Sequence, residues 1–341
     1  MSITNVKLKD FLVFKNEFSA DFCPGVNILL GWNGTGKTTL MKALYAACNW
    51  RNQTYDEERL SHIFSYFSFA YDEKNKYADS NGYSFPPFYL KVSTEDSKFI
   101  INAWNDEEDY HYREGDLLTL KTVFVPSFEL YSRSEGLLSL NERYTLGFDK
   151  TDMDLLLAIG MPTLRNPSNK VRTLLEKIAQ IIEYDIKDGK DGLVLSKKGE
   201  KDIDLAFEAS GYRKLYVLWM LLANGLLDDG SVLFWDEPEN SLNSELVPTI
   251  VEILLEIANN GVQIFIASHD YNFVRYFDIR KSKNIPVLFH YLSKDSTGQI
   301  NCNSSPKYMK LPNNHLEKAA ENLYEAVITD AMEGNGDVKQ K

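Results

Sequence analysis

Apolar runs and amphipathic segments alternate along the chain, and their order predicts the secondary structure. The first apolar run, residues 26–30, follows a segment rich in β-branched and aromatic residues, and residues 37–47, rich in helix formers, come directly after it. Later apolar runs predict buried strands at 122–126, 232–235, 262–267 and 286–295. Helical spacing or composition predicts helices over 168–185, 211–227, 244–261 and 315–332. Two further segments, 88–104 and 192–205, have the pattern of hairpins.

The alternation of strand, helix and strand predicts an α/β fold. Crossovers of this length are right-handed and pair their strands in parallel, while the segment before residue 26 predicts antiparallel strands. We therefore expect a mixed sheet, N-terminal antiparallel strands and a single domain over residues 1–341. Within it we predict an insertion or lid at 50–120, where charged and aromatic residues mix, a helical subdomain at 122–204, and a C-terminal strand and helix extension at 280–341.

Composition narrows the classes of partner. No stretch approaches the roughly 20 apolar residues that span a bilayer, and the three cysteines are far apart, which argues against a disulfide framework or a zinc site. We therefore expect a cytoplasmic protein without a membrane partner. The net charge of −12 disfavours nucleic-acid binding, although a local basic groove remains compatible with it.

A glycine-rich loop stands between the first apolar run and the helix after it. Residues 31–38, GWNGTGKT, fit the pattern G-x-x-x-x-G-K-[ST] at every fixed position. Glycines let successive backbone N–H groups face one concavity that collects phosphate oxygens, and the helix adds its positive end. Lys37 reaches the β and γ phosphates and Thr38 ligates Mg²⁺ in such loops. The expected nucleotide-binding residues are Asn33, Gly34, Thr35, Gly36, Lys37, Thr38 and Thr39.

Acidic and imidazole side chains follow two other predicted strands. Asp236 and Glu237 end the run at 232–235, and His269 follows the run at 262–267. In open α/β sheets ligands bind at the carboxyl edge, where these residues emerge. We expect Asp236 to hold Mg²⁺, Glu237 to orient or deprotonate the attacking water, and His269 to contact the γ-phosphate. Together with Lys37 these last two form the predicted catalytic set. Taken without the glycine-rich loop, Asp236 and Glu237 would be interpreted as a solvated surface pair, and His269 as a capping histidine.

With these motifs in order, the chain resembles the ABC-type ATPases of the group that includes Rad50, SMC, RecF and OLD-like proteins. It is most similar to the short bacterial AAA_15/AAA_21-type ATPases of anti-phage defence. The similarity is strong over residues 1–48 and over residues 205–275, which include the segment DEPENSLN, and it is loose elsewhere. The expected fold class is therefore a P-loop NTPase with an ABC-ATPase-type head, with 122–204 on its signature side.

The resemblance implies further residues. EASGYRKL resembles the ABC signature, in which Ser210 and Gly211 would contact the γ-phosphate of a nucleotide on the opposite subunit; a helix N-cap is the alternative for Ser210. Asn243 would lie in the D-loop, which crosses the dimer interface. This arrangement implies an isologous homodimer that forms around two ATP molecules.

Two features of the family's pattern are not evident in this sequence. At the place of the Q-loop, residues 125–130, the sequence offers Ser127 and Glu129 in place of the family's glutamine. Phe11 or Phe14 is a candidate for stacking on adenine, with core packing as the alternative.

Three hypotheses remain for the biological role. The first is an ATPase that regulates or drives a separate effector, a nuclease or toxin, in anti-phage defence. The second is a RecF-like ATPase that acts on DNA in repair or recombination, which the net charge disfavours. The third is a slow nucleotide-gated scaffold that holds or releases a protein partner.

Overall fold

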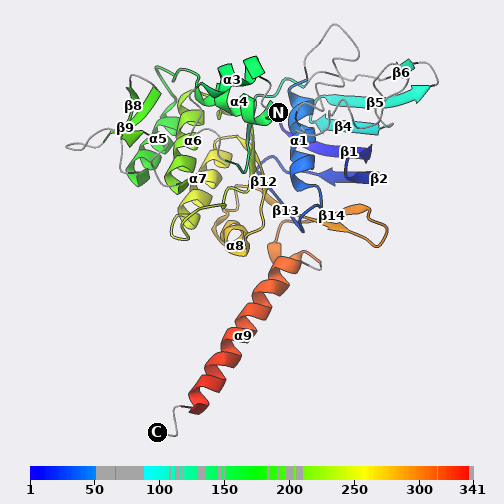
Figure 1. Cartoon of the computed structure of the whole chain (residues 1–341), viewed down its shortest axis with the longest axis vertical. Helices are drawn as coiled ribbons and strands as arrows, with labels where there is room; N and C mark the ends of the chain where they lie inside the picture. The colour runs from blue at the N-terminus through cyan, green and yellow to red at the C-terminus, as the bar shows by residue number, and fades with distance from the viewer. Residues whose placement is uncertain are drawn as a thin grey trace.

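The computed structural model describes residues 1–50, 66, 88–106, 109–111, 116, 118–128, 136–144, 148, 150–182, 185–189, 192–196, 203–204, 210–312 and 314–337. Within these residues, two large sheets enclose one helix, and further helices cover the outer face of the larger sheet (Figure 1). The expected α/β architecture, with a mixed sheet and N-terminal antiparallel strands, is confirmed. No helix of the described part combines the length and apolarity needed to cross a membrane.

The larger sheet is mixed and has the order β14-β13-β3-β12-β11-β7. Its strands are β3 (Val26–Gly31), β7 (Thr122–Val125), β11 (Val232–Asp236), β12 (Gln263–Ala267), β13 (Val287–Lys294) and β14 (Ile300–Ser305). All neighbours pair in parallel except β13 and β14. Both faces of β3, β11 and β12 are buried, which explains why their sequences read as continuous apolar runs. Their carboxyl ends therefore meet at one edge.

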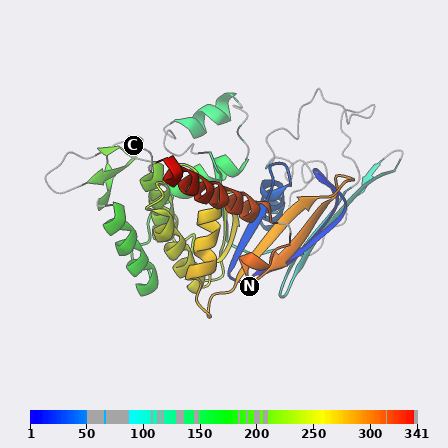
Figure 2. The ribbon, with the colours of Figure 1, turned by 90° about the horizontal axis from the view of Figure 1, so that it is seen from below.

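The second sheet is antiparallel and has the order β2-β1-β4-β5-β6. Its strands are β1 (Ile3–Phe11), β2 (Phe14–Asp21), β4 (Phe88–Thr94), β5 (Lys98–Asp106) and β6 (Asp109–His111). Helix α1 (Lys37–Cys48) lies between the two sheets in both views (Figures 1 and 2). Its side chains share one hydrophobic cluster with inward residues of both sheets. The helix that follows the glycine loop is thus fixed from two sides.

Helices cover the opposite face of the mixed sheet (Figure 2). They are α4 (Lys150–Ile159), α5 (Asn169–Ile182), α6 (Ser210–Ala223), α7 (Val247–Asn259) and α8 (Tyr271–Arg280). Beside them stand α3 (Leu137–Tyr144) and a small antiparallel sheet of β8 (Asp185–Gly189), β9 (Gly192–Ser196) and β10 (Ile203–Asp204). The large apolar side chains of these helices make the second hydrophobic cluster of the protein.

Helix α9 (His315–Asp337) follows the short helix η3 (Tyr308–Lys310) and projects away from the body (Figure 1). Most of its described side chains are exposed. They include the large apolar residues Leu323, Tyr324, Val327, Ile328 and Met332.

Strands from the predicted insertion and from the predicted helical subdomain pair with strands of the two large sheets. From segment 50–120, β4 pairs with β1 and so extends the N-terminal sheet, whereas 51–65 and 67–87 lie outside the described residues. From segment 122–204, β7 joins the mixed sheet beside β11. The domain boundaries, including the extension at 280–341, stay a prediction. Asp152 and Asp154 lie in α4, where Asp154 accepts a hydrogen bond from the Tyr45 hydroxyl.

Candidate functional site: a phosphate loop facing two acids

The glycine loop of residues 31–38 connects the buried strand β3 to α1, as the sequence predicts. Gly34 and Gly36 have φ values of 75° and 85°, a left-handed conformation that glycine adopts without a steric cost. A Cβ on Gly36 would lie 2.8 Å from Phe14 Cζ, and one on Gly31 would lie 2.3 Å from the Leu292 carbonyl oxygen. The loop therefore needs glycine at these positions for its turn and for its close contact with neighbouring strands.

Lys37 is buried at the start of α1 and folds back over the loop. Its Nζ donates to the carbonyl oxygens of Gly31, at 2.9 Å, and Trp32, at 3.1 Å. Burial lowers the pKa of Lys37 to about 8, although the charges of Asp236 and Glu237 oppose this shift. Within the described residues the hydrogen-bond partners of this ammonium are carbonyl oxygens, which it can exchange for anionic oxygens.

Asp236 and Thr38 meet at the edge of the sheet. The Thr38 hydroxyl donates to Asp236 Oδ2 at 2.9 Å, and burial raises the pKa of Asp236 to about 6. A hydroxyl and a carboxylate are oxygen donors of the kind that Mg²⁺ prefers, with substrate phosphates completing its shell. The described residues hold no cluster of three or more His, Cys, Asp or Glu suited to a metal. The donor pair therefore fits a magnesium ion whose remaining ligands come from a triphosphate.

Glu237 and His269 face each other across β11 and β12. Glu237 Oε1 lies 3.7 Å from His269 Nε2, and the Glu237 N–H donates to the carbonyl oxygen of Ala267 at 2.9 Å. Burial and the charge of Lys37 lower the pKa of His269, while Glu237 opposes the shift. The imidazole is therefore neutral at pH 7, with one N–H to donate. Glu237 itself has a φ of 48°, in the left-handed region that residues other than glycine adopt only at a steric cost.

The residues expected to act across a dimer lie on neighbouring elements of the same chain. Helix α6 begins at Ser210. A Cβ on Gly211 would lie 2.9 Å from Leu246 and 3.5 Å from Leu242, so the start of α6 packs on the turn that carries Asn243. The Asn243 side chain is exposed and accepts a hydrogen bond from the Glu245 N–H. Their contact with a second subunit stays a prediction.

Other sequence-predicted positions have mixed outcomes. Phe11 and Phe14 are fully buried in the cluster around α1, so core packing explains them and adenine stacking does not. At the expected Q-loop, Ser127 follows β7, and Glu129 lies outside the described residues. Along the loop, Thr35 is buried and donates to the Trp32 carbonyl, Thr39 is half-buried in the first turn of α1, and Asn33 is exposed.

Sequence reasoning missed two residues of the site. Buried Lys214 of α6 donates to the carbonyl oxygens of Glu237, Pro238 and Asn240, and so braces the turn after β11. Glu239 accepts hydrogen bonds from the loop that carries His269. The sequence did offer a signal for each of them. Lys214 is a charged residue among the apolar positions of a predicted helix, and Glu239 is a further acid directly after Pro238.

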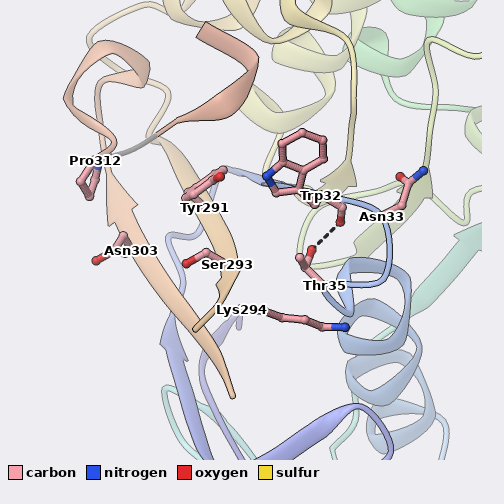
Figure 3. A pocket seen from close by; sticks show the side chains of 8 residues that line it. All are labelled: Trp32, Asn33, Thr35, Tyr291, Ser293, Lys294, Asn303 and Pro312. Atoms are coloured by element: carbon pink, nitrogen blue, oxygen red, sulfur yellow. Dashed lines mark hydrogen bonds between the residues drawn. The ribbon is translucent and has the colours of Figure 1, made fainter. Parts of the chain in front are cut away.

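Beside the phosphate loop lies a cavity of about 480 Å³, shown in Figure 3. Trp32 and Thr35 from the loop face Tyr291 and Ser293 of β13, and Lys294 reaches toward the start of α1. The Trp32 ring is stacked on His315, the first residue of α9, at 4.2 Å between centroids. The root of the projecting helix therefore contacts the loop.

Two known families match the chain. Residues 124–275 match AAA_21, described as "AAA domain, putative AbiEii toxin, Type IV TA system", and residues 5–110 match AAA_23, an AAA domain. The first match contains Asp236, Glu237 and His269, and the second contains the phosphate loop.

Three known proteins illustrate the relationship. The L-cystine import ATP-binding protein TcyN of Bacillus subtilis (strain 168) is 23% identical over 249 residues, which cover 60% of this chain and 90% of TcyN. The DNA replication and repair protein RecF of Lactobacillus gasseri is 51% identical over 45 residues, only 13% of this chain and 12% of RecF. The structure of an SMC head bound to the C-winged helix domain of ScpA is 13% identical, covers 89% of this chain and 98% of that chain, and has a TM-score of 0.53. The SMC head and this chain therefore share their fold.

Proposed function

We propose that this chain, which matches the AAA_21 and AAA_23 families over 124–275 and 5–110 and shares the fold of an SMC head, binds and hydrolyses ATP as an ATP-promoted homodimer that controls a separate effector protein. The observation that carries the enzymatic part is one cluster at the sheet edge. In it Thr38 binds Asp236, Glu237 lies beside His269, and the charge of Lys37 interacts with those of Asp236 and Glu237.

Each residue has a role in the proposed hydrolysis. Lys37 leaves the carbonyl oxygens of its own loop and binds the β and γ phosphates. Glu237 accepts a proton from water as the water oxygen bonds to the γ-phosphorus. The bond from that phosphorus to the bridging oxygen then breaks, and ADP leaves with the electron pair. Neutral His269 donates a hydrogen bond to the γ-phosphate. A bound Mg²⁺, held by Thr38 and Asp236, would neutralise charge on the phosphates.

The proposed dimer completes each site from the partner subunit. Ser210 and Gly211 of one subunit would contact the γ-phosphate that the other subunit holds, and Asn243 would cross the interface. The packing of Gly211 against the turn of Leu242 supports this, because one rigid unit then carries both contacts. The SMC-head fold supports dimerisation as well.

A separate effector is the proposed output, and anti-phage defence is its proposed setting, in the cytoplasm. The description of AAA_21, which names a toxin system, supports this class of partner. Helix α9 also supports a protein partner, because its exposed apolar residues lie in two adjacent rows, Leu323–Val327 and Tyr324–Ile328–Met332. A nuclease or toxin is the kind of effector that we expect.

A DNA repair ATPase is the second candidate, and the local identity to RecF favours it. The net charge of −12 argues against it. Stimulation of ATP turnover by double-stranded DNA, with an affinity that falls steeply with salt, would support this candidate over the first. Turnover unaffected by DNA would support the first.

The primary test removes the ammonium of the phosphate loop. Lys37→Ala is expected to abolish binding of ATP, because the buried cation that meets the phosphates is lost while the loop glycines remain. Calorimetric titration with a non-hydrolysable ATP analogue measures this, and Lys177→Ala, which removes a lysine of α5 paired with Glu256, serves as the control for loss of a lysine. Unchanged affinity of Lys37→Ala would overturn the phosphate-binding role of the loop.

A further inference from the structure

Glu239 lies between the two segments that carry the proposed catalytic residues. We propose that Glu239 is a positioning residue for hydrolysis, whose carboxylate ties the loop of His269 to the turn of Glu237. The inference rests on the proposed function, since it concerns the geometry of that site. Glu239 does not reach the reacting atoms itself; it acts through His269.

Two hydrogen bonds converge on one oxygen of Glu239. Its Oε1 accepts from Ser268 Oγ at 2.8 Å and from the backbone N–H of His269 at 2.9 Å. Ser268 is fully buried, and its own hydroxyl accepts from the Asp270 N–H at 3.2 Å. The loop of residues 268–270 is therefore held through the Glu239 carboxylate, and the bond at His269 fixes the backbone from which the imidazole extends.

The backbone that carries Glu239 is held as well. The Asn240 N–H donates to the carbonyl oxygen of Glu237 at 3.0 Å, and the Lys214 ammonium donates to that of Pro238 at 2.9 Å. Glu237 and Glu239 thus belong to one braced turn. Because Glu239 binds the neighbouring loop from this turn, it sets the separation of 3.7 Å between Glu237 Oε1 and His269 Nε2.

The second carboxylate oxygen takes no part in the tether, because both hydrogen bonds of the tether end on Oε1. Glu239 Oε2 is buried and has no hydrogen-bond partner within the described residues, which costs free energy. Burial accordingly raises the pKa of Glu239. Because the tether needs only an acceptor oxygen at the position of Oε1, glutamine is expected to replace glutamate there.

The test compares Glu239→Ala with Glu239→Gln in the full chain. Loss of the tether in Glu239→Ala should lower kcat for ATP by about tenfold to a hundredfold, the cost of a misplaced catalytic group, with KM changed less than about twofold. Glu239→Gln should keep kcat within about threefold of the wild type, since it retains the acceptor. Glu252→Ala, a glutamate on the outer side of α7 paired with Arg280, is the control for loss of a carboxylate.

A double-mutant cycle locates the effect at His269. If Glu239 acts through His269, then His269→Ala should add little to the loss already caused by Glu239→Ala. Full additivity of the two losses would overturn the proposal, as would wild-type kcat in Glu239→Ala. An equal loss in Glu239→Gln and Glu239→Ala would also overturn it, because the charge and not the tether would then matter.

A second measurement does not depend on hydrolysis. The imidazole of His269, assigned by NMR through His269→Ala, should titrate below its ordinary pKa in the wild type and in Glu239→Gln. In Glu239→Ala the freed loop should move the pKa of His269 toward 6.5. If Glu239→Ala fails to fold, Ser268→Ala takes its place in this measurement. An unchanged pKa would overturn the tether. A wild type that binds ATP without turnover would instead contradict the proposed function and leave this measurement valid.

Discussion

At the scale of single residues, the buried Asp236 makes the stability of the fold depend on pH. Its carboxyl has a pKa of about 6 in the folded protein, against 3.8 for the unperturbed group, because burial disfavours the charge. The folded chain therefore holds this proton more tightly than the unfolded chain. The stabilisation from the protonated acid is present below about pH 4 and is lost as the pH rises through about 6.

Asp236→Asn should accordingly stabilise the protein at pH 7 in the absence of Mg²⁺. A shift from 3.8 to about 6 corresponds to about 3 kcal/mol of unfolding free energy, and asparagine keeps an acceptor for Thr38. Urea unfolding at pH 7 and at pH 4 measures this gain, which should fall to about 0.5 kcal/mol at the lower pH. A gain of the same size at pH 4 would assign the effect to packing, and no gain at pH 7 would contradict the burial penalty.

At the scale of elements, the phosphate loop depends on the β1–β2 hairpin behind it. A Cβ on Gly36 would lie 2.8 Å from Phe14 and 2.9 Å from Val13, at a φ of 85°. Gly36→Ala should therefore cost more than the roughly 1 kcal/mol of a left-handed alanine and weaken ATP binding, as thermal unfolding and analogue titration would measure. Gly230→Ala is the matched control, because Gly230 has a φ of 81° with nothing within 4 Å. Equal losses in the two variants would contradict the bracing contact.

The elements divide into those that the sequence predicts and those that it does not. Strands β3, β11 and β12 were predicted because both faces are buried, and α5 and α7 because their apolar residues recur at helical spacing. Helix α4 was missed, since its ten residues bury only Thr151, Leu155 and Leu156 and carry two acids. A short helix with few buried residues gives a weak periodic signal.

The candidate site shows the same division. The loop and the pair Asp236–Glu237 were predicted because each forms a local pattern, and the structure brings them together. Glu239 and Lys214 were missed because their partners are distant in sequence: Glu239 binds Ser268 and His269, and Lys214 binds the turn 237–240. Only the pairing of β11 with β12 makes the first of these contacts evident.

At the scale of the whole molecule, the proposed function predicts that ATP binding determines whether the protein is a monomer or a dimer. Glu237→Gln should bind ATP and Mg²⁺ normally but retain the nucleotide, since the group that accepts the proton from water is lost. The variant should then elute as a dimer in size-exclusion chromatography with light scattering when ATP is present, and as a monomer without nucleotide. Lys37→Ala should remain monomeric in both conditions. A Glu237→Gln protein that binds ATP and stays monomeric would contradict the proposed dimer.

The stack of Trp32 on His315 joins the loop to the root of α9, and Trp32 is 62% exposed. An indole in that position emits light that depends on the imidazole beside it and on the water around it. The protein thus carries an intrinsic fluorophore at the junction of its nucleotide loop and its projecting arm, and because the sequence has four other tryptophans, its signal is obtained as the difference between the wild type and Trp32→Phe. Changes at either end can be followed in real time, without a chemical label.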